Sequence, residues 1–218
     1  MEEIGFLNNK ILKNISIGIT IGILSFLIAY AVEMTILNAQ GLNPKLEFYI
    51  SGFSLTEDIV KNTGLLFFIL CISLNIVNVI MEEGIFRGLF LNLAKEKYSF
   101  MISNLIVAFF FGIWHFVVPL RSYIDGHMNF ITMISMGLGY IILAGIMSIK
   151  WGMIRFMNGS IWIGLAEHFF NNTIGNLLHV TTSTGVDELQ ILRIVIAQLL
   201  TFSVIGVLYK RNKKVKIF

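Results

Sequence analysis

The sequence predicts an all-α protein, a polytopic bundle of transmembrane helices, and three observations carry this prediction. Of the 218 residues, 56% are hydrophobic and only 13% are charged, whereas about a quarter of a soluble domain is charged. Long apolar segments recur along the chain, which has a mean hydropathy of +0.80. Basic residues gather beside alternate ends of these segments. With two prolines and no Gly/Ser-rich linker, the chain is expected to form a single membrane domain over residues 1–218.

Six segments are apolar enough to cross the membrane, since a helix needs about 20 residues to span roughly 30 Å of hydrocarbon. They lie at about 14–37, 64–94, 100–120, 130–149, 158–180 and 190–209. The first segment has no small-residue cleavage site, so it indicates a membrane anchor rather than a signal peptide. The second is too long for a perpendicular span, so it is expected to tilt or to continue past the membrane as an amphipathic helix.

The distribution of basic residues predicts the orientation of the chain. With the N-terminus inside, eleven basic residues fall at cytoplasmic ends, including Lys150, Arg155 and the tail 210–216. Four fall on the opposite side, including Arg193. Because Lys and Arg in short loops favour the cytoplasm, we expect a multi-pass plasma-membrane protein with both termini inside. The basic tail then faces the bilayer surface, and no nucleic-acid partner is expected.

Ionisable side chains within membrane spans are costly, so each is a candidate for function. Glu33 and His179 lie near outer ends of spans and His127 lies in a loop, so we expect these three to reach the interface or the surface. Cys71, the single cysteine, is expected to be a small buried hydrophobe and can form no intramolecular disulfide.

The stretch MEEGIFRG (81–88) places three charges within an apolar run. Glu83 and Arg87 are four residues apart with the acid first, the favourable arrangement for an ion pair on a helix. Glu82 points about 100° away and cannot share Arg87 equally. A buried carboxylate left without a cation is suited to act as a general base near neutral pH.

Two further stretches carry imidazole and amide groups. His115 lies in FFFGIWHF (109–116), and AEHFFNNTIGN (166–176) places His168 and Asn172 on one helix face. Counted from the cytoplasmic ends at 1.5 Å per residue, Glu82, His115 and His168 lie about 18, 22 and 15 Å into the membrane. The three side chains can therefore meet at one level.

These residues are compatible with more than one chemistry. A carboxylate beside a neutral imidazole can deprotonate water, while a second imidazole and an amide can stabilise an oxyanion, which together serve hydrolysis of an amide. Glu82, His115 and His168 could instead ligate Zn²⁺ and leave one position open, although no H-E-x-x-H motif is present. Charges inside a membrane also suit a transporter or channel, and spacing alone favours hydrolysis only slightly.

Three motifs follow one another on three predicted spans: Glu82-Glu83-x-x-x-Arg87, Phe111-x-x-x-His115 and His168-x-x-x-Asn172. This pattern resembles the CAAX protease and bacteriocin-processing (CPBP, or Abi) family of intramembrane endopeptidases. Phe86 and Gly88 match the common form of the first motif. The resemblance covers roughly residues 60–180, which are expected to form the protease core.

The resemblance implies a helical bundle around a polar intramembrane cavity and a peptidase activity. It assigns Glu82 as the base that activates water, with His115 as its partner. His168 and Asn172 would stabilise the oxyanion, and the neighbouring ion pair would hold the motif's helix. We favour this metal-free chemistry over zinc because it gives all four residues a role.

The resemblance also bears on the substrate. The short chain, rich in Ile, Asn and Lys, is typical of low-GC bacteria, which generally lack prenylated CAAX substrates. We therefore expect a bacterial peptide or membrane-protein substrate, in bacteriocin maturation, signal-peptide maturation or self-immunity. A non-catalytic membrane scaffold of the same family and a small-solute transporter remain open alternatives, as does the oligomeric state.

Overall fold

The structure, a computed structural model, describes residues 4–7, 10–51 and 61–215. Almost all of this part of the chain is helical, with two short strands. The elements in chain order are α1 Ile11–Ala39, β1 Lys45–Phe48, α2 Leu65–Glu82, η1 Glu83–Phe90, α3 Leu91–Lys97, α4 Phe100–His115, α5 Val117–Ile124, α6 Phe130–Asn158, α7 Trp162–Leu177, β2 Leu178–Thr181 and α8 Gln190–Val215.

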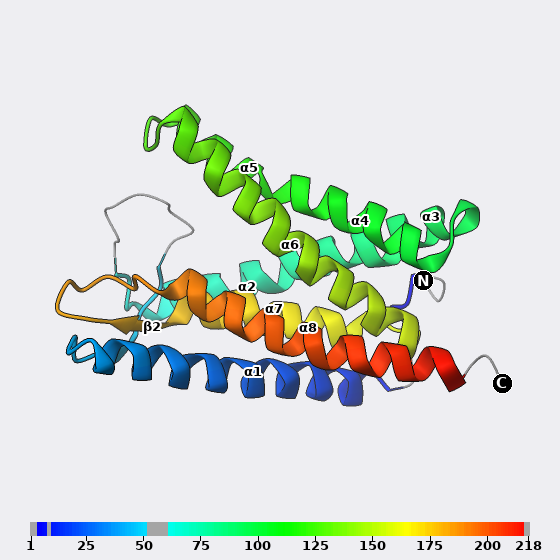
Figure 1. Ribbon diagram of the computed structural model, residues 1–218, viewed down its shortest axis with the longest axis horizontal. Helices are drawn as coiled ribbons and strands as arrows, with labels where there is room; N and C mark the ends of the chain where they lie inside the picture. Colours follow the sequence, from blue (N-terminus) through cyan, green and yellow to red (C-terminus); the bar gives the residue numbers. More distant parts are fainter. Residues whose placement is uncertain (1–3, 8–9, 52–60, 216–218) are drawn as a thin grey trace.

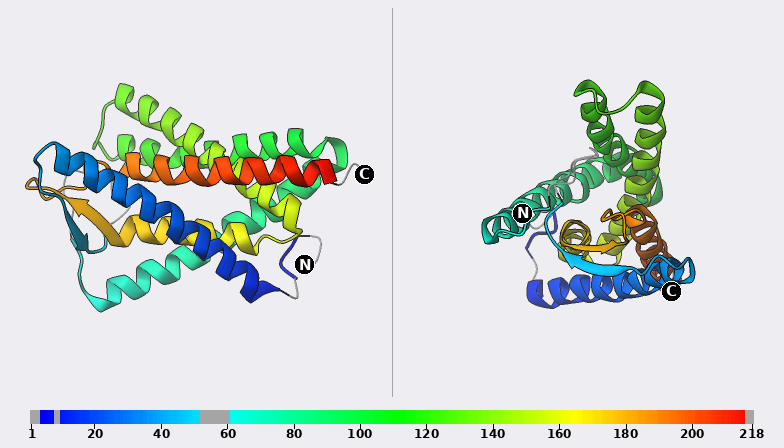
Figure 2. Two further views of the ribbon diagram at one scale, coloured as in Figure 1. Left: turned by 60° about the horizontal axis from the view of Figure 1, so that its bottom comes forward. Right: turned by 90° about the vertical axis from the view of Figure 1, so that its left-hand side faces the viewer.

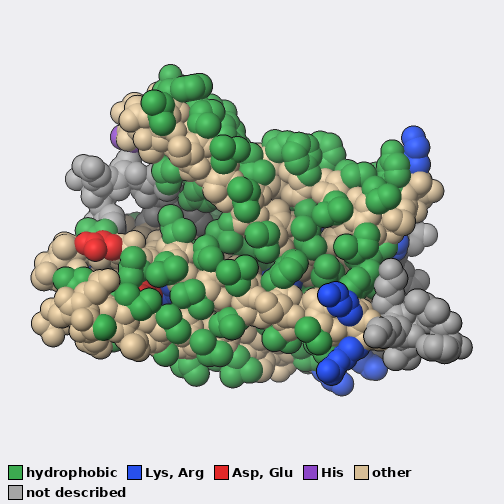
Figure 3. Space-filling view, viewed as in Figure 1, with side chains coloured by type: hydrophobic (Ala, Val, Ile, Leu, Met, Phe, Trp, Pro, Cys, Tyr) green, Lys and Arg blue, Asp and Glu red, His purple; other side chains and the backbone are tan. Residues whose placement is uncertain are grey.

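Five helical stretches of the described chain are long and apolar enough to cross a membrane. They are Ile11–Ala39, Leu65–Lys97, Phe100–Ile124, Phe130–Asn158 and Gln190–Asn212. The second joins α2, η1 and α3 into one rod of 33 residues, so the long second segment continues as a helix. Apolar side chains are spread along the length of the face seen in Figure 3, whereas charged side chains gather at its two ends, as lipid contact requires. The prediction of an all-α, multi-pass membrane protein is confirmed.

The sixth predicted segment, 158–180, differs from the other five. Its helix, α7, has 16 residues and is followed by β2, which pairs antiparallel with β1. Ten residues of α7 are buried, because the helix packs against α1, α2, α6 and α8. A helix enclosed by other helices does not have to match the lipid thickness, which explains why it is shorter than expected. The start of α1 and the end of α8 lie at the same end of the bundle (Figure 1), so α7 traverses the bundle as a sixth helix beside the five long stretches.

Helices α1 and α8 run side by side with the buried α7, while α4, α5 and α6 form the other part of the molecule (Figures 1 and 2). Close packing of α1 on α7 depends on glycine. A Cβ at Gly18 would lie 2.3 Å from the Ile163 carbonyl oxygen, and one at Gly22 would lie 2.5 Å from the Phe170 ring. Small residues let the helix backbones approach in this way.

Helix α6 extends further than the sequence predicts. It continues from residue 149 to Asn158 and stops at Gly159, whose left-handed backbone (φ 70°) forms its C-terminal cap. The expectation that Lys150 lies at a cytoplasmic end is therefore wrong, since this residue is 0% exposed inside the bundle. The helix continues through Lys150 because the residues that follow it, WGMIRFMN (151–158), contain no proline.

At the end of the bundle that carries the strands, three predicted surface groups are buried. Glu33 is ion-paired with Arg193 at 2.5 Å, and neither side chain is exposed. His179 is 1% exposed, stacks on Tyr49 and lies 3.1 Å from Asp187. The expectation that Glu33 and His179 reach the interface or the surface is wrong, because Arg193 and Asp187 pair with them after folding. Arg193 lies on the side opposite the termini, as predicted, but it is buried there.

Candidate active site

The charged stretch 81–88 lies where the long α2–α3 rod changes its winding. Glu82 ends α2, and Glu83–Phe90 forms a π-helical segment, a rare element that is frequent at functional sites. Glycines at 84 and 88 bring η1 against the N-terminal segment, because their Cβ positions would lie 3.4 Å from Phe6 and 3.2 Å from Ile4. Glu82, Glu83 and Arg87 are all buried on the inner side of the rod.

The predicted pair of Glu83 and Arg87 is present, with 3.2 Å between Oε1 and Nη1. The Arg87 guanidinium lies 4.2 Å from the centre of the Phe111 ring and 4.8 Å from that of Trp151. Its three nitrogens have no hydrogen-bond partner among the described residues. Aromatic faces and one carboxylate therefore hold this cation in place of hydrogen bonds.

His168 joins the two adjacent carboxylates. Its Nδ1 lies 2.9 Å from Glu83 Oε1, and its Nε2 lies 3.5 Å from Glu82 Oε2. The imidazole stacks on the Trp151 indole, with ring centres 4.0 Å apart and planes 20° apart. The contact between His168 and Glu83 is one that sequence reasoning missed, since it assigned Glu83 to Arg87 alone. Since a carboxylate accepts, Nδ1 donates, and the imidazole presents Nε2 to Glu82.

Glu82 keeps one oxygen without a hydrogen bond. The residue is 3% exposed, and its Oε1 accepts a hydrogen bond from Trp114 Nε1 at 3.1 Å. Its Oε2 has no hydrogen-bond partner among the described residues. Trp114 was not predicted, although it directly precedes His115. Glu82 is thus a buried carboxylate with one oxygen oriented and the other uncommitted.

His115 lies near this group without a direct hydrogen bond to Glu82 or His168. Its Nδ1 is 2.8 Å from the Phe111 carbonyl oxygen, so Nδ1 carries the hydrogen and Nε2 is left for another partner. Glu82 and His168 are close enough to interact with it electrostatically. The structure therefore places the three predicted residues in one region, with His115 set apart from the Glu82–His168 contact.

Glu82, His115 and His168 are also the residues that the sequence offers as ligands of a zinc ion. In the described part of the chain, no group of three or more His, Cys, Asp or Glu side chains is arranged to hold a metal ion. The supporting acceptors that zinc-bound imidazoles require are nevertheless present, since Glu83 bonds to His168 and the Phe111 carbonyl bonds to His115. Glu167, which directly precedes His168 in the chain, does not serve as this acceptor, because neighbouring residues on a helix point about 100° apart.

Asn172 lies one turn after His168 on α7. Its Oδ1 accepts a hydrogen bond from Asn171 Nδ2 at 3.2 Å, and its backbone carbonyl accepts one from Asn176 at 2.8 Å. Because Oδ1 is engaged, the end of this amide that can donate to another group is Nδ2.

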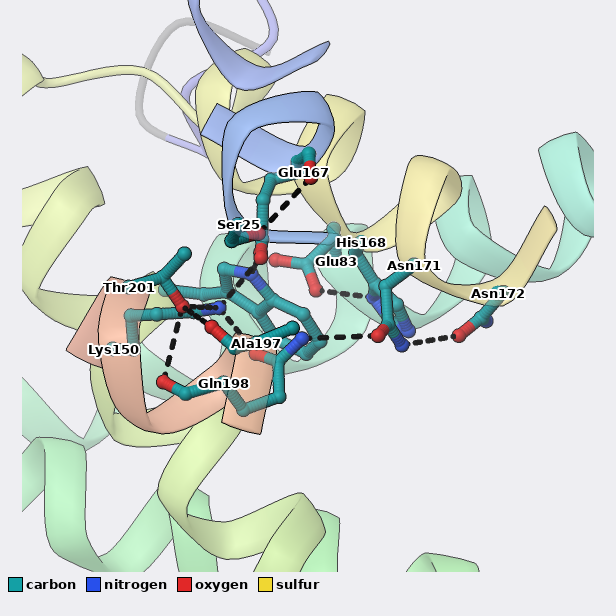
Figure 4. Close-up of polar contacts among 12 residues, drawn as sticks. Ser25, Glu83, Lys150, Glu167, His168, Asn171, Asn172, Ala197, Gln198 and Thr201 are labelled. Atoms are coloured by element: carbon teal, nitrogen blue, oxygen red, sulfur yellow. Dashed lines mark hydrogen bonds and ion pairs between the residues drawn. The ribbon is translucent and has the colours of Figure 1, made fainter. Parts of the chain in front are cut away.

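A second polar group, which sequence reasoning also missed, lies behind His168 (Figure 4). Lys150 contacts Glu167, Gln198 and Thr201, so α6, α7 and α8 each contribute to it. The signal was present in the sequence, because Lys150 and Glu167 each lie in an apolar stretch. Lys150 was not assigned to the site because it was placed at a cytoplasmic end, and Glu167 was not assigned to it because a residue next to His168 on a helix points about 100° away from it.

A buried carboxylate–imidazole cluster in a multi-pass membrane protein is compatible with a membrane-embedded enzyme. The model of one family, described as type II CAAX prenyl endopeptidase Rce1-like, matches residues 64–174, just over half of the chain. The chain therefore belongs to this family, which points to a peptidase acting in the membrane. No curated protein and no solved structure gives a significant match.

Proposed function

We propose that the protein is an intramembrane endopeptidase that hydrolyses a peptide bond with a water molecule activated by Glu82. The observation that carries the proposal is the state of Glu82: buried, oriented by Trp114, and with Oε2 unbonded 3.5 Å from His168 Nε2. A carboxylate held in this way can accept a proton from water without first giving up a hydrogen bond.

The other side chains have complementary roles in the proposed reaction. Glu82 Oε2 takes a proton from water as the hydroxide oxygen bonds to the carbonyl carbon of the substrate. Because Nδ1–H of His168 is held by Glu83, Nε2 donates only in the doubly protonated imidazolium form; in that form Nε2, together with Asn172 Nδ2, stabilises the oxyanion of the tetrahedral intermediate. The C–N bond then breaks, and the proton held by Glu82 passes to the leaving amine. His115, near Glu82 and His168, is the further partner of the base.

For the substrate we propose an unprenylated bacterial peptide or membrane-protein segment, processed in bacteriocin or signal-peptide maturation or in self-immunity. Support comes from the short chain rich in Ile, Asn and Lys and from the position of the cluster within the apolar bundle. The family description names prenyl endopeptidases, so prenylated peptides are the competing class.

Reconstituted protein and two probes test this function. The first is a set of unprenylated apolar peptides, and the second is an internally quenched peptide ending in a farnesylated CAAX sequence. We expect wild-type protein to cleave members of the first set at internal bonds, as detected by mass spectrometry. Cleavage of the farnesylated probe alone would contradict the substrate class. Folded wild-type protein that cleaves neither probe would contradict the peptidase, in favour of a scaffold or a transporter.

We further propose that cleavage needs no bound metal. Exhaustive chelation of the purified wild-type protein should leave the cleavage rate unchanged, and elemental analysis should find no stoichiometric zinc. Stoichiometric zinc, with activity lost on its removal and restored on its return, would contradict this.

The proposed location is the bacterial plasma membrane, with both termini in the cytoplasm. Support comes from the basic side chains near the end that carries the termini (Figure 3) and from the rule that such residues stay inside. An enzyme that is active only outside the cytoplasm, fused after Phe218, should be inactive. An active fusion protein would show that the C-terminus lies outside the cytoplasm and would contradict the proposed orientation.

A further inference from the structure

A buried ion pair that the proposed reaction does not use lies directly behind the candidate site. Lys150 on α6 and Glu167 on α7 are both 0% exposed, with 2.7 Å between Nζ and Oε1. A buried ion pair is weak evidence for stability, because apolar side chains of similar volume often serve as well. Its occurrence beside the site suggests a role in placing neighbouring groups.

Every polar atom of this pair has a partner. Lys150 Nζ also contacts Gln198 Oε1 at 2.5 Å and Thr201 Oγ1 at 3.0 Å, which uses all three ammonium hydrogens. The second oxygen of Glu167 accepts a hydrogen bond from Trp151 Nε1. Charge-assisted hydrogen bonds at both ends fix the orientation of the Glu167 carboxylate and of the Trp151 indole.

One path from this pair leads to His168. Each partner of the ion pair is followed in the chain by an aromatic residue of this path. Trp151 follows Lys150 on α6, and His168 follows Glu167 on α7. Glu167 fixes the Trp151 indole, and His168 stacks on that indole with ring centres 4.0 Å apart. The plane of Trp151 therefore determines where the imidazole of His168 lies between the two carboxylates.

A second path leads to Asn172 (Figure 4). Gln198, whose Oε1 contacts Lys150, donates from Nε2 to Asn171 Oδ1 at 2.9 Å. Asn171 in turn donates from Nδ2 to Asn172 Oδ1 at 3.2 Å. This chain of amides holds the acceptor end of Asn172 and turns its Nδ2 away from Asn171.

We propose that Lys150 and Glu167 are positioning residues for the peptidase reaction. Lys150 is the common origin of both paths, so one buried ammonium group aligns both proposed oxyanion donors, His168 and Asn172. The inference rests on the proposed function for its kinetic meaning, and its structural content can be tested separately.

The path through Trp151 is tested by two double variants that both remove the buried charges. Lys150→Met/Glu167→Gln keeps an oxygen that can accept from the indole, whereas Lys150→Met/Glu167→Leu does not. Both variants lose the Lys150 contact with Gln198, so the ratio of their kcat values isolates the effect of the hydrogen bond to Trp151. We expect kcat of the Leu variant to be lower than that of the Gln variant by about tenfold or more, with similar KM, because misplacing a reacting group is costly. Equal kcat values would overturn this path.

The path through Gln198 has its own matched control. Gln198→Leu breaks the connection to Asn171, whereas Thr201→Val removes another contact of the same ammonium group without touching the amide chain. We expect Gln198→Leu to lower kcat by about tenfold and Thr201→Val to change it by less than about twofold. Equal losses from the two variants would mean that Lys150 acts on stability alone.

A spectroscopic measurement separates failure of this inference from failure of the proposed function. In protein with ¹⁵N-labelled Trp and His, Trp151→Phe identifies the indole resonance of Trp151. Lys150→Met/Glu167→Leu should shift both that resonance and the imidazole resonances of His168, while the Gln variant keeps them near their wild-type positions. If the His168 resonances are alike in the two variants, the positioning role is wrong, whether or not the protein cleaves the probe peptides.

Discussion

His168 is connected to two buried charged groups, to one directly through Glu82 and Glu83 and to the other through Trp151. The two groups differ in how completely their polar atoms are hydrogen-bonded. The Lys150–Glu167 group is saturated, since Nζ has three acceptors and each carboxylate oxygen of Glu167 has a donor. In the group at the junction of α2 and η1, the atoms without a hydrogen-bond partner among the described residues are Glu82 Oε2, Glu83 Oε2 and all three nitrogens of Arg87.

The difference indicates a division of work between the two groups. Unbonded buried polar atoms cost free energy, so a folded protein keeps few of them without a use. Saturated groups hold neighbours in place, whereas unbonded groups can bind or exchange protons with a substrate. On this comparison α6, α7 and α8 hold the neighbouring groups in place, and the end of α2, at its junction with η1, presents the reactive carboxylate of Glu82.

The largest expected effect on stability comes from breaking the saturated group. Lys150→Met leaves Glu167 as an unpaired buried charge, so the free energy of unfolding should fall by about 3–5 kcal/mol. Arg87→Met should cost less, because Arg87 has no full hydrogen bonds to lose and Glu83 keeps its bond to His168. Reversible denaturation in SDS and lipid–detergent mixtures measures both variants. A larger loss from Arg87→Met would contradict the comparison.

The next largest effect concerns the proposed oxyanion donors. Asn172→Ala removes the Nδ2 donor without removing any charge, so kcat should fall by about 10²–10³ while KM stays similar. Steady-state cleavage of the best probe peptide measures this. Asn176→Ala, which removes a nearby amide that bonds only to the Asn172 backbone carbonyl, is the control and should retain most of the activity.

A smaller effect is expected from the hydrogen bond that orients Glu82. Trp114→Phe removes the donor to Oε1, and because the indole is 49% exposed the loss should be about 1 kcal/mol, or roughly fivefold in kcat. Trp162→Phe makes the same chemical change at the 2.8 Å bond to the Phe6 carbonyl, away from the cluster. If both variants lose activity equally, Trp114 has no special part in orienting Glu82.

The smallest effect is a pH dependence at the end that carries the strands. Burial alone would raise the pKa of Asp187, but hydrogen bonds from His179 and Arg193 outweigh it and lower the pKa below its usual value. A lowered pKa in the folded state means that the stabilisation is complete above the unfolded pKa of about 3.9 and disappears as pH falls through the folded value. Stability should therefore decline as pH falls below about 4, and it should decline less in Asp187→Asn. Equal acid sensitivity of the two proteins would contradict this.

Much of the fold could be predicted from the sequence, because the cost of burying backbone polar groups in lipid permits few alternatives to helices. Local spacing also predicted the Glu83–Arg87 pair, since residues four apart on a helix are neighbours. Contacts between residues that lie far apart in the sequence could not be predicted in this way. Nothing near His168 in the chain indicates that Trp151 will stack on it.

The failures have a common physical origin. Lys150 and Arg193 were assigned to the two sides of the membrane from the distribution of basic residues, and each is buried beside an acid from another helix. Charge pairing between helices depends on which helices are adjacent, and the number of spans does not determine that. Trp114 was missed because an indole in an apolar run has no pattern that distinguishes a hydrogen-bond donor from a lipid contact.

The most direct test of Glu82 as the base is Glu82→Gln, studied for rate and stability in the same preparation. Gln keeps the shape of the side chain and an oxygen for Trp114 but cannot take a proton from water. The cleavage rate should fall by about 10²–10⁴, while the free energy of unfolding stays near that of the wild type. A Glu82→Gln protein that cleaves the probe peptide at close to the wild-type rate would contradict the assignment of Glu82 as the base.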